Sequence, residues 1–165
     1  MREKVKVYIE RCRENARIPV YANPEDAGMD IYAADECMIR PGETVLVPTG
    51  LKVAIPEGYE IQIRPRSGIS LRTKLRLSNS PGTIDSGYRD EICIIMSNLS
   101  DPGEADKIKT LEKGSGGHGT YRISSGDRIA QMVISRVPMI DFSEIDSVED
   151  IGMNRGGGFG STGHK

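Results

Sequence analysis

The stretch PGETVLVPTGLKVAIPEGYEIQIR, residues 41–64, decides the fold. It carries three turn pairs that stand eight residues apart: Pro41-Gly42, Thr49-Gly50 and Glu57-Gly58. Between and after them lie three short runs rich in β-branched residues, at 44–47, 51–55 and 59–63. Regular turns with strand-like runs between them are typical of an all-β sandwich or barrel. We therefore predict an all-β domain.

Other runs in the chain extend this pattern. Ile61 and Ile63 alternate with polar neighbours, which predicts a strand with one wet face. Apolar runs at 91–96 and 128–137 predict two more strands, the first of them buried. The periodicity leaves a strand or a short helix open for residues 5–9, and a strand or one helical turn for residues 106–113. No helical pattern longer than about ten residues is found.

Composition restricts the classes of function. The 165 residues suit one domain with a hydrophobic core of its own. A net charge of −2 gives no reason to expect a nucleic-acid partner. No apolar run reaches the roughly 18 residues of a membrane helix. Three cysteines without a CxxC pair and a charged N-terminus indicate a reducing, cytoplasmic setting, and two histidines cannot build a histidine-rich metal site.

Local charge is more informative than the total. Residues 61–89 hold six basic side chains and one acid, Asp85, which suits a small polyanion with a base beside it. Residues 141–150 hold five acids and no base, a pattern typical of a solvated face.

Two segments within or beside the basic stretch could carry chemistry. In Pro65-Arg66-Ser67-Gly68, the guanidinium and the hydroxyl suit phosphate oxygens, although an ordinary turn has the same sequence pattern. Asp85 could polarise a water molecule for attack or could simply bond its own turn. Tyr88, three residues later, offers a flat face for a ring.

The glycine-rich tail admits four interpretations, two of which are rejected. Residues 158–163 match GxGxxG, but no helix can follow in the two residues that remain, so a dinucleotide-binding fold is rejected. A Walker A loop is also rejected, because His164 stands where the lysine should be. What remains is a tail whose backbone N–H groups and hydroxyls suit phosphate, or a tail with no ordered structure.

Five segments taken together are more specific than any one of them. In chain order they are residues 27–33, 65–68, 82–88, 126–131 and 157–163. They resemble the five motifs of the trimeric dUTP diphosphatase (dUTPase) family over nearly the whole chain. The resemblance implies a β jelly roll that forms a homotrimer with three shared active sites. It also implies hydrolysis of dUTP to dUMP and pyrophosphate, which keeps uracil out of DNA and supplies dUMP for thymidylate synthesis.

The resemblance further implies a role for individual residues. Asp85 is the implied base for the attacking water, Gln131 positions the phosphate chain or the water, and Ser67 lies near the leaving oxygen. Tyr88 packs beneath the deoxyribose. The other implied substrate-binding residues are Asn79, Gly82 and Ile84 for uracil, Arg66 and Gly68 for the β-phosphate region, and Arg155, Phe159, Gly160, Ser161 and Thr162 in the tail. Mg²⁺ is held mainly by phosphate oxygens and waters, with indirect support from Asp30 through water.

The predicted organisation is a domain over residues 1–151, with a long inserted loop at 100–125, and an arm over residues 152–165 that closes on the site. Two positions depart from the family pattern. Arg155 precedes Phe159 by four residues, whereas the family's usual distance of five falls on Asn154, and Asp90 replaces a common glycine. The alternative functions are dCTP deamination, alone or combined with dUTP hydrolysis, and a weakly catalytic dUTP-binding regulator. Asp85 and Tyr88 favour hydrolysis.

Overall fold

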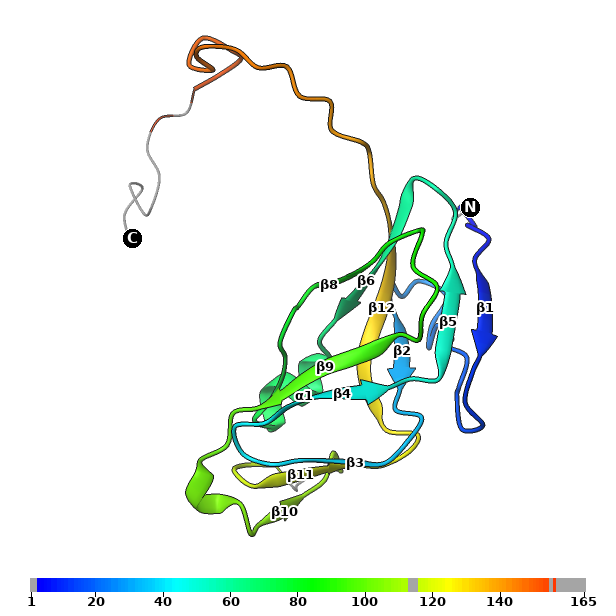
Figure 1. Ribbon diagram of the computed structural model, residues 1–165, viewed down its shortest axis with the longest axis vertical. Helices are drawn as coiled ribbons and strands as arrows, with labels where there is room; N and C mark the ends of the chain where they lie inside the picture. The colour runs from blue at the N-terminus through cyan, green and yellow to red at the C-terminus, as the bar shows by residue number, and fades with distance from the viewer. Residues whose placement is uncertain (1–2, 113–115, 155, 157–165) are drawn as a thin grey trace.

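Strands are the main regular elements of the computed structural model, which describes residues 3–112, 116–154 and 156 (Figure 1). The strands are β1 (Tyr8–Arg11), β2 (Met29–Tyr32), β3 (Cys37–Ile39), β4 (Thr44–Pro48), β5 (Leu51–Ala54), β6 (Tyr59–Arg64), β7 (Leu75–Leu77), β8 (Gly82–Ile84), β9 (Cys93–Asn98), β10 (Ile108–Lys109), β11 (Thr120–Ile123) and β12 (Arg128–Arg136). The helical elements of the described residues are α1 (Ser67–Arg72) and a 3₁₀ turn, η1 (Pro102–Glu104). The predicted all-β class is confirmed.

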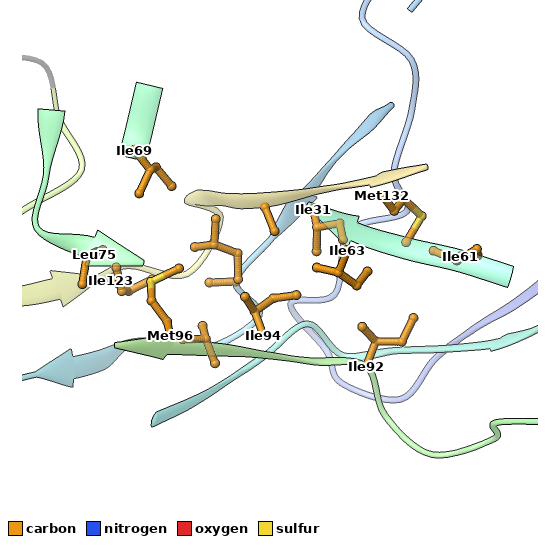
Figure 2. Packing of buried hydrophobic residues seen from close by; sticks show 14 of the residues in the cluster. Ile31, Ile61, Ile63, Ile69, Leu75, Ile92, Ile94, Met96, Ile123 and Met132 are labelled. Atoms are coloured by element: carbon orange, nitrogen blue, oxygen red, sulfur yellow. The ribbon is translucent and has the colours of Figure 1, made fainter. Parts of the chain in front are cut away.

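Two sheets enclose the core in a jelly-roll-like sandwich. One has the strand order β2-β12-β6-β8 and the other β4-β9-β7, while β10-β11-β3 forms a second three-stranded sheet and β1-β5 a two-stranded one. Figure 2 shows side chains from β2, β6 and β12 meeting side chains from β9 between the layers. Among them, Ile31, Ile94 and Met96 have at most 1% of their surface exposed. Each such burial contributes about 1.5–3 kcal/mol of hydrophobic free energy.

The deciding stretch folds as its turns predict. Gly42, Gly50 and Gly58 have φ angles of 78°, 69° and 80°, the left-handed backbone that glycine adopts without strain. The predicted strands between and after these turns are present as β4, β5 and β6. On β6 the isoleucines are buried and the polar residues are partly exposed, so the prediction of one wet face is confirmed.

The other predicted elements have mixed outcomes. The run at 128–137 is confirmed as β12, and both open segments contain strands, β1 and β10. The buried strand predicted at 91–96 is present as β9, but its start and its burial differ from the prediction. β9 begins at Cys93 and alternates, with only every second residue buried. Small and apolar residues on its outer face, such as Ile95, hid this alternation in the sequence.

The body ends with β12, and residues 137–154 run away from it as an extended segment (Figure 1). Every residue in this segment is exposed, including the acidic stretch 141–150. Within the residues described above, no helix is long and apolar enough to cross a membrane.

Candidate functional site

One carboxylate joins two arginines where β2, β12 and the start of α1 meet. The Nε–H of Arg66 donates to Oδ1 of Asp30 at 2.7 Å, and Nη1 of Arg128 donates to Oδ2 at 3.1 Å. The side chains of Asp30 and Arg66 are 22% and 25% exposed, so water screens this pair less than a surface pair. The sequence predicted roles for Asp30 and Arg66. It gave none to Arg128, although that residue lies inside the quoted segment 126–131.

Gln131 lies on the same level of the sheet as this cluster. It is the register partner of Asp30 on one side and of Arg64 on the other. Its Nε2 donates to the carbonyl of Pro65 at 3.0 Å, which ties β12 to the residue before Arg66. Gly28 leaves room for this amide, because a Cβ there would lie 3.0 Å from Oε1 of Gln131. Gln131 and Arg66 are therefore brought together beside Asp30.

The short helix α1 carries the other predicted phosphate residues. Arg66 is its N-cap, and its carbonyl accepts from the N–H groups of Ile69 and Ser70 at 3.1 Å. Ser67 is exposed and Gly68 is partly buried. A polar cavity of about 390 Å³ opens beside them. Its arginine side chains are Arg17, Arg66, Arg72 and Arg128. This surface has the charge that a polyphosphate needs.

A hairpin carries the predicted base-binding residues. β8 is an edge strand that pairs with β6, with Gly82 opposite Ile63 and Ile84 opposite Ile61. An edge strand leaves one row of backbone N–H and C=O groups without a strand partner. Asn79 lies on the loop before the strand, and a Cβ at Gly82 would sit 3.3 Å from its Nδ2. The hairpin thus brings Asn79 next to the buried Gly82.

Asp85 and Tyr88 share the turn that follows β8. The N–H of Tyr88 donates to the carbonyl of Asp85 at 3.1 Å, and the Tyr88 hydroxyl donates to the carbonyl of Glu91 at 2.9 Å. Desolvation, followed by the charge of Asp90, raises the pKa of Tyr88, so the phenol keeps its proton as a donor. Asp85 is exposed, as a carboxylate that meets a ligand must be.

The turn that carries Asp85 and the cluster around Asp30 and Arg66 lie far apart within one chain. Along the strands, the level of Asp85 is four residues beyond that of Asp30, and three strand spacings separate β8 from β2. These offsets amount to about 13 Å along the strands and about 14 Å across them, so on the order of 20 Å in all. Because Arg66 binds Asp30, Asp85 and Arg66 of one chain cannot meet the same phosphorus atom.

The tail residues assigned a role, Arg155, Phe159, Gly160, Ser161 and Thr162, lie outside the described residues. Asn154 is described and exposed, and its Oδ1 accepts from the N–H of Gly156 at 2.9 Å. Among the residues that the structure does describe, no three His, Cys, Asp or Glu side chains form a cluster that could hold a metal ion.

Comparison with known proteins identifies relatives of the whole chain. The sequence model of the dUTPase family matches residues 14–113. A deoxyuridine 5'-triphosphate nucleotidohydrolase of Wolbachia pipientis wMel is 44% identical and covers 98% of both chains. A protein of the same name from Hydrogenobaculum sp. is also 44% identical, over 98% of this chain and 100% of its own.

Solved structures agree with this relationship. The dUTPase of Staphylococcus bacteriophage 80alpha with dUpNHpp has a TM-score of 0.84 and 31% identity, over 96% of this chain and 99% of its own. A mutant dUTPase from phage phi11 of S. aureus, which coordinates a structural Mg(II) ion, has a TM-score of 0.77 and 29% identity. The match covers 87% of this chain and 99% of the phage protein.

Proposed function

This chain belongs to the dUTPase family, and we propose that it hydrolyses dUTP to dUMP and pyrophosphate. The observation that carries the proposal is the edge hairpin β8 followed directly by an exposed Asp85 and Tyr88. It places a base-reading edge, a carboxylate and an aromatic ring within seven residues. The relatives named nucleotidohydrolases, which match nearly the full length, support the same reaction.

The hairpin selects the base. The free edge of β8, near Gly82 and Ile84, offers backbone donors and acceptors to the uracil edge, with Asn79 beside them. Cytosine presents the wrong donor pattern and leaves buried polar groups unpaired, which is the stronger filter. Thymine is rejected because the space beside Gly82 is narrow: even a Cβ at this residue would lie 3.3 Å from Nδ2 of Asn79, which leaves little room for a methyl group.

The chemistry takes place at the α-phosphorus. Asp85 accepts a proton from the attacking water, a contribution of roughly 10²–10⁴ in rate. Tyr88 packs beneath the deoxyribose. Ser67 lies near the leaving oxygen, while Arg66, Gly68 and Gln131 hold and orient the phosphate chain. Asp30 fixes the direction of Arg66 through its 2.7 Å ion pair.

A magnesium ion fits this site when substrate phosphates and waters, rather than protein side chains, supply most of its ligands. Both oxygens of Asp30 bind arginines, so the described residues offer no dedicated cage. Mg²⁺ keeps several waters and commonly binds through substrate phosphates. When bound to dUTP in this way, with Asp30 supporting it through water, Mg²⁺ supplies positive charge against the phosphate oxygens.

We propose that the active sites are shared among the copies of a homotrimer. The separation of about 20 Å between Asp85 and the Asp30–Arg66 pair supports this, because a second copy can bring the two groups together. The segment 137–154 supports it as well. Its exposed apolar side chains, which need a partner surface, are Val137, Met139, Ile140, Phe142, Ile145, Val148, Ile151 and Met153.

The glycine-rich arm over residues 152–165 completes the proposal. In it Phe159 stacks on the uracil, Gly160, Ser161 and Thr162 meet the γ-phosphate, and Arg155 adds positive charge. We place the enzyme in the cytoplasm, and the three cysteines, none of which is paired among the described residues, support a reducing compartment.

Parallel assays of pyrophosphate release from dUTP, dCTP and dTTP test the function. We expect release from dUTP alone and no ammonia from dCTP. Ammonia release would identify a deaminase instead. Tight binding of dUTP without turnover would identify a regulator and would contradict the proposed reaction.

A further inference from the structure

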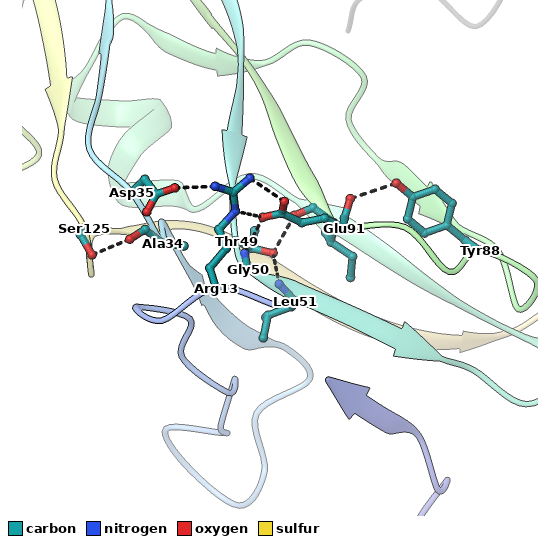
Figure 3. A network of polar contacts seen from close by, with 10 residues as sticks. Arg13, Ala34, Asp35, Thr49, Gly50, Leu51, Tyr88, Glu91 and Ser125 are labelled. Carbon is teal, nitrogen blue, oxygen red and sulfur yellow. Dashed lines mark hydrogen bonds and ion pairs between the residues drawn. The ribbon is translucent and has the colours of Figure 1, made fainter. Parts of the chain in front are cut away.

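Arg13 joins two loops that are distant in the sequence, and it precedes the residues 14–113 that the family model matches. Its Nε and Nη2 donate to the two carboxylate oxygens of Glu91 at 2.7 and 2.8 Å, and its Nη1 donates to Asp35 at 2.7 Å (Figure 3). The Glu91 side chain is only 18% exposed, against 41% for Arg13. This two-pronged geometry fixes both position and orientation of the carboxylate.

Glu91 is held from a third direction as well. The N–H of Gly50 donates to its Oε1 at 2.8 Å. Hydrogen bonding from Arg13, which outweighs the effect of burial, lowers the pKa of Glu91, so this carboxylate is charged at neutral pH. Gly50 itself lies under the N-terminal segment, because a Cβ at this residue would be 2.6 Å from the Cβ of Ala16. Arg13 and Glu91 therefore belong to one fixed arrangement.

This arrangement ends at Tyr88. The Tyr88 hydroxyl donates to the backbone carbonyl of Glu91, as Figure 3 shows. The next residue, Ile92, is held in turn, because its N–H donates to the carbonyl of Leu51 at 2.8 Å. The tyrosine ring is thus anchored at its tip to the backbone of the residue whose side chain Arg13 holds.

We propose that Arg13 is a positioning residue that sets the orientation of Tyr88 through Glu91, and so tightens the selection of deoxyribose over ribose. The inference rests on the proposed role of Tyr88 beneath the sugar. Without Arg13, the N–H of Gly50 is the one hydrogen-bond donor left to the Glu91 carboxylate among the described residues, and the carboxylate turns toward water. The Glu91–Ile92 peptide is then held mainly by the bond from the Ile92 N–H to Leu51, so the carbonyl that anchors the ring becomes more mobile and space opens for a 2′-hydroxyl.

The test compares Arg13→Ala and Arg13→Lys with a matched control in the full-length protein. The control is Arg40→Ala, since Arg40 forms an exposed ion pair with Glu43 at 3.8 Å on another loop. Two quantities are measured well below the melting transition. They are the ratio of kcat/KM for dUTP to that for UTP, and the amide hydrogen exchange of residues 85–92.

For Arg13→Ala we expect the dUTP/UTP ratio to fall about tenfold, because a small misplacement of a binding group costs this much or more. Exchange in residues 85–92 rises in the same variant. For Arg13→Lys we expect a ratio between those of the wild type and Arg13→Ala, since an ammonium keeps the charge but loses the two-pronged geometry. A purely structural role of Arg13 would reduce turnover of both substrates equally. It would leave the ratio unchanged.

An Arg13→Ala ratio equal to that of Arg40→Ala overturns the inference, and so does unchanged exchange in residues 85–92. If Arg13→Ala fails to fold, the ratio and the exchange are measured on Arg13→Lys instead. Wild-type values of both in that variant would overturn the inference. Failure of the proposed function can be told apart from failure of this inference. If the proposed function is wrong, the wild-type protein does not hydrolyse dUTP. If only the inference is wrong, the wild-type protein still hydrolyses dUTP.

Discussion

Asp30 on β2 accepts a 2.7 Å hydrogen bond from Arg66, the residue that caps α1, across 36 positions of sequence. The same carboxylate accepts from Arg128, so a single acid orients two arginines beside the polar cavity. In the proposed function, Asp30 acts on the phosphate chain through the arginine that it holds.

Replacing Asp30 with Asn tests this relationship. The amide keeps the size of the side chain but removes the charge that fixes both arginines. We expect kcat/KM for dUTP to fall about 10²-fold, because Arg66 no longer points at the phosphate chain. The exposed Asp106 provides a control, and Asp106→Asn should retain wild-type kinetics. Equal kinetics for the two variants would contradict the role of Asp30.

Gly28 tests the placement of Gln131. A Cβ at residue 28 would lie 3.0 Å from Oε1 of Gln131 and 3.3 Å from the carbonyl of Met132, so Gly28→Ala displaces the amide. We expect about a tenfold loss in kcat with a small change in melting temperature. Gly103→Ala is the matched control, since its nearest atom would be an ordinary 3.4 Å away. Full activity in Gly28→Ala would show that Gln131 needs no fixed position.

Asp85→Asn tests the general base. The substitution preserves shape and removes the proton acceptor, so we expect kcat to fall roughly 10²–10⁴-fold while dUTP binding is largely kept. Steady-state kinetics and binding of a non-hydrolysable dUTP analogue separate the two effects. Retention of full turnover would exclude Asp85 as the base.

The ion pair of Arg13 and Glu91 predicts a pH dependence of stability. Because the folded pKa of Glu91 is lowered, its stabilising effect is present above the ordinary glutamate pKa and is lost as pH falls through the folded value. Glu91→Gln should therefore melt about 5 °C below the wild type at pH 7. In acid, below the folded pKa of Glu91, the melting temperatures of the variant and the wild type should become equal. A difference in melting temperature that does not change with pH would contradict this account.

The sequence predicted more of the fold than of the site. Regular turns, such as that at Gly50, and the alternation around Ile61 predicted the strands directly, because local backbone geometry determines both. The alternation of β9 is not visible in the sequence, because Ile95 on its outer face is apolar and only tertiary packing leaves it partly exposed.

Long-range partners could not be predicted from local patterns. Arg128 pairs with Asp30 because β2 and β12 are neighbours in the sheet, and no local spacing announces that pairing. Arg13 is 78 positions from Glu91 and lies in no motif. The distance between Asp85 and Arg66 within one chain likewise depends on the order of four strands, which sequence periodicity does not specify.

In the proposed homotrimer, one active site takes Asp85 from one copy of the chain and Arg66 from another. The most direct test of this shared site is to mix Asp85→Asn chains with Arg66→Ala chains, to unfold and refold them together, and to measure dUTP turnover. Each variant alone should be nearly inactive. With equal amounts and random assembly, about a quarter of the shared sites regain both residues, so about a quarter of wild-type activity should return. Activity that stays at the level of the separate variants would contradict the shared site.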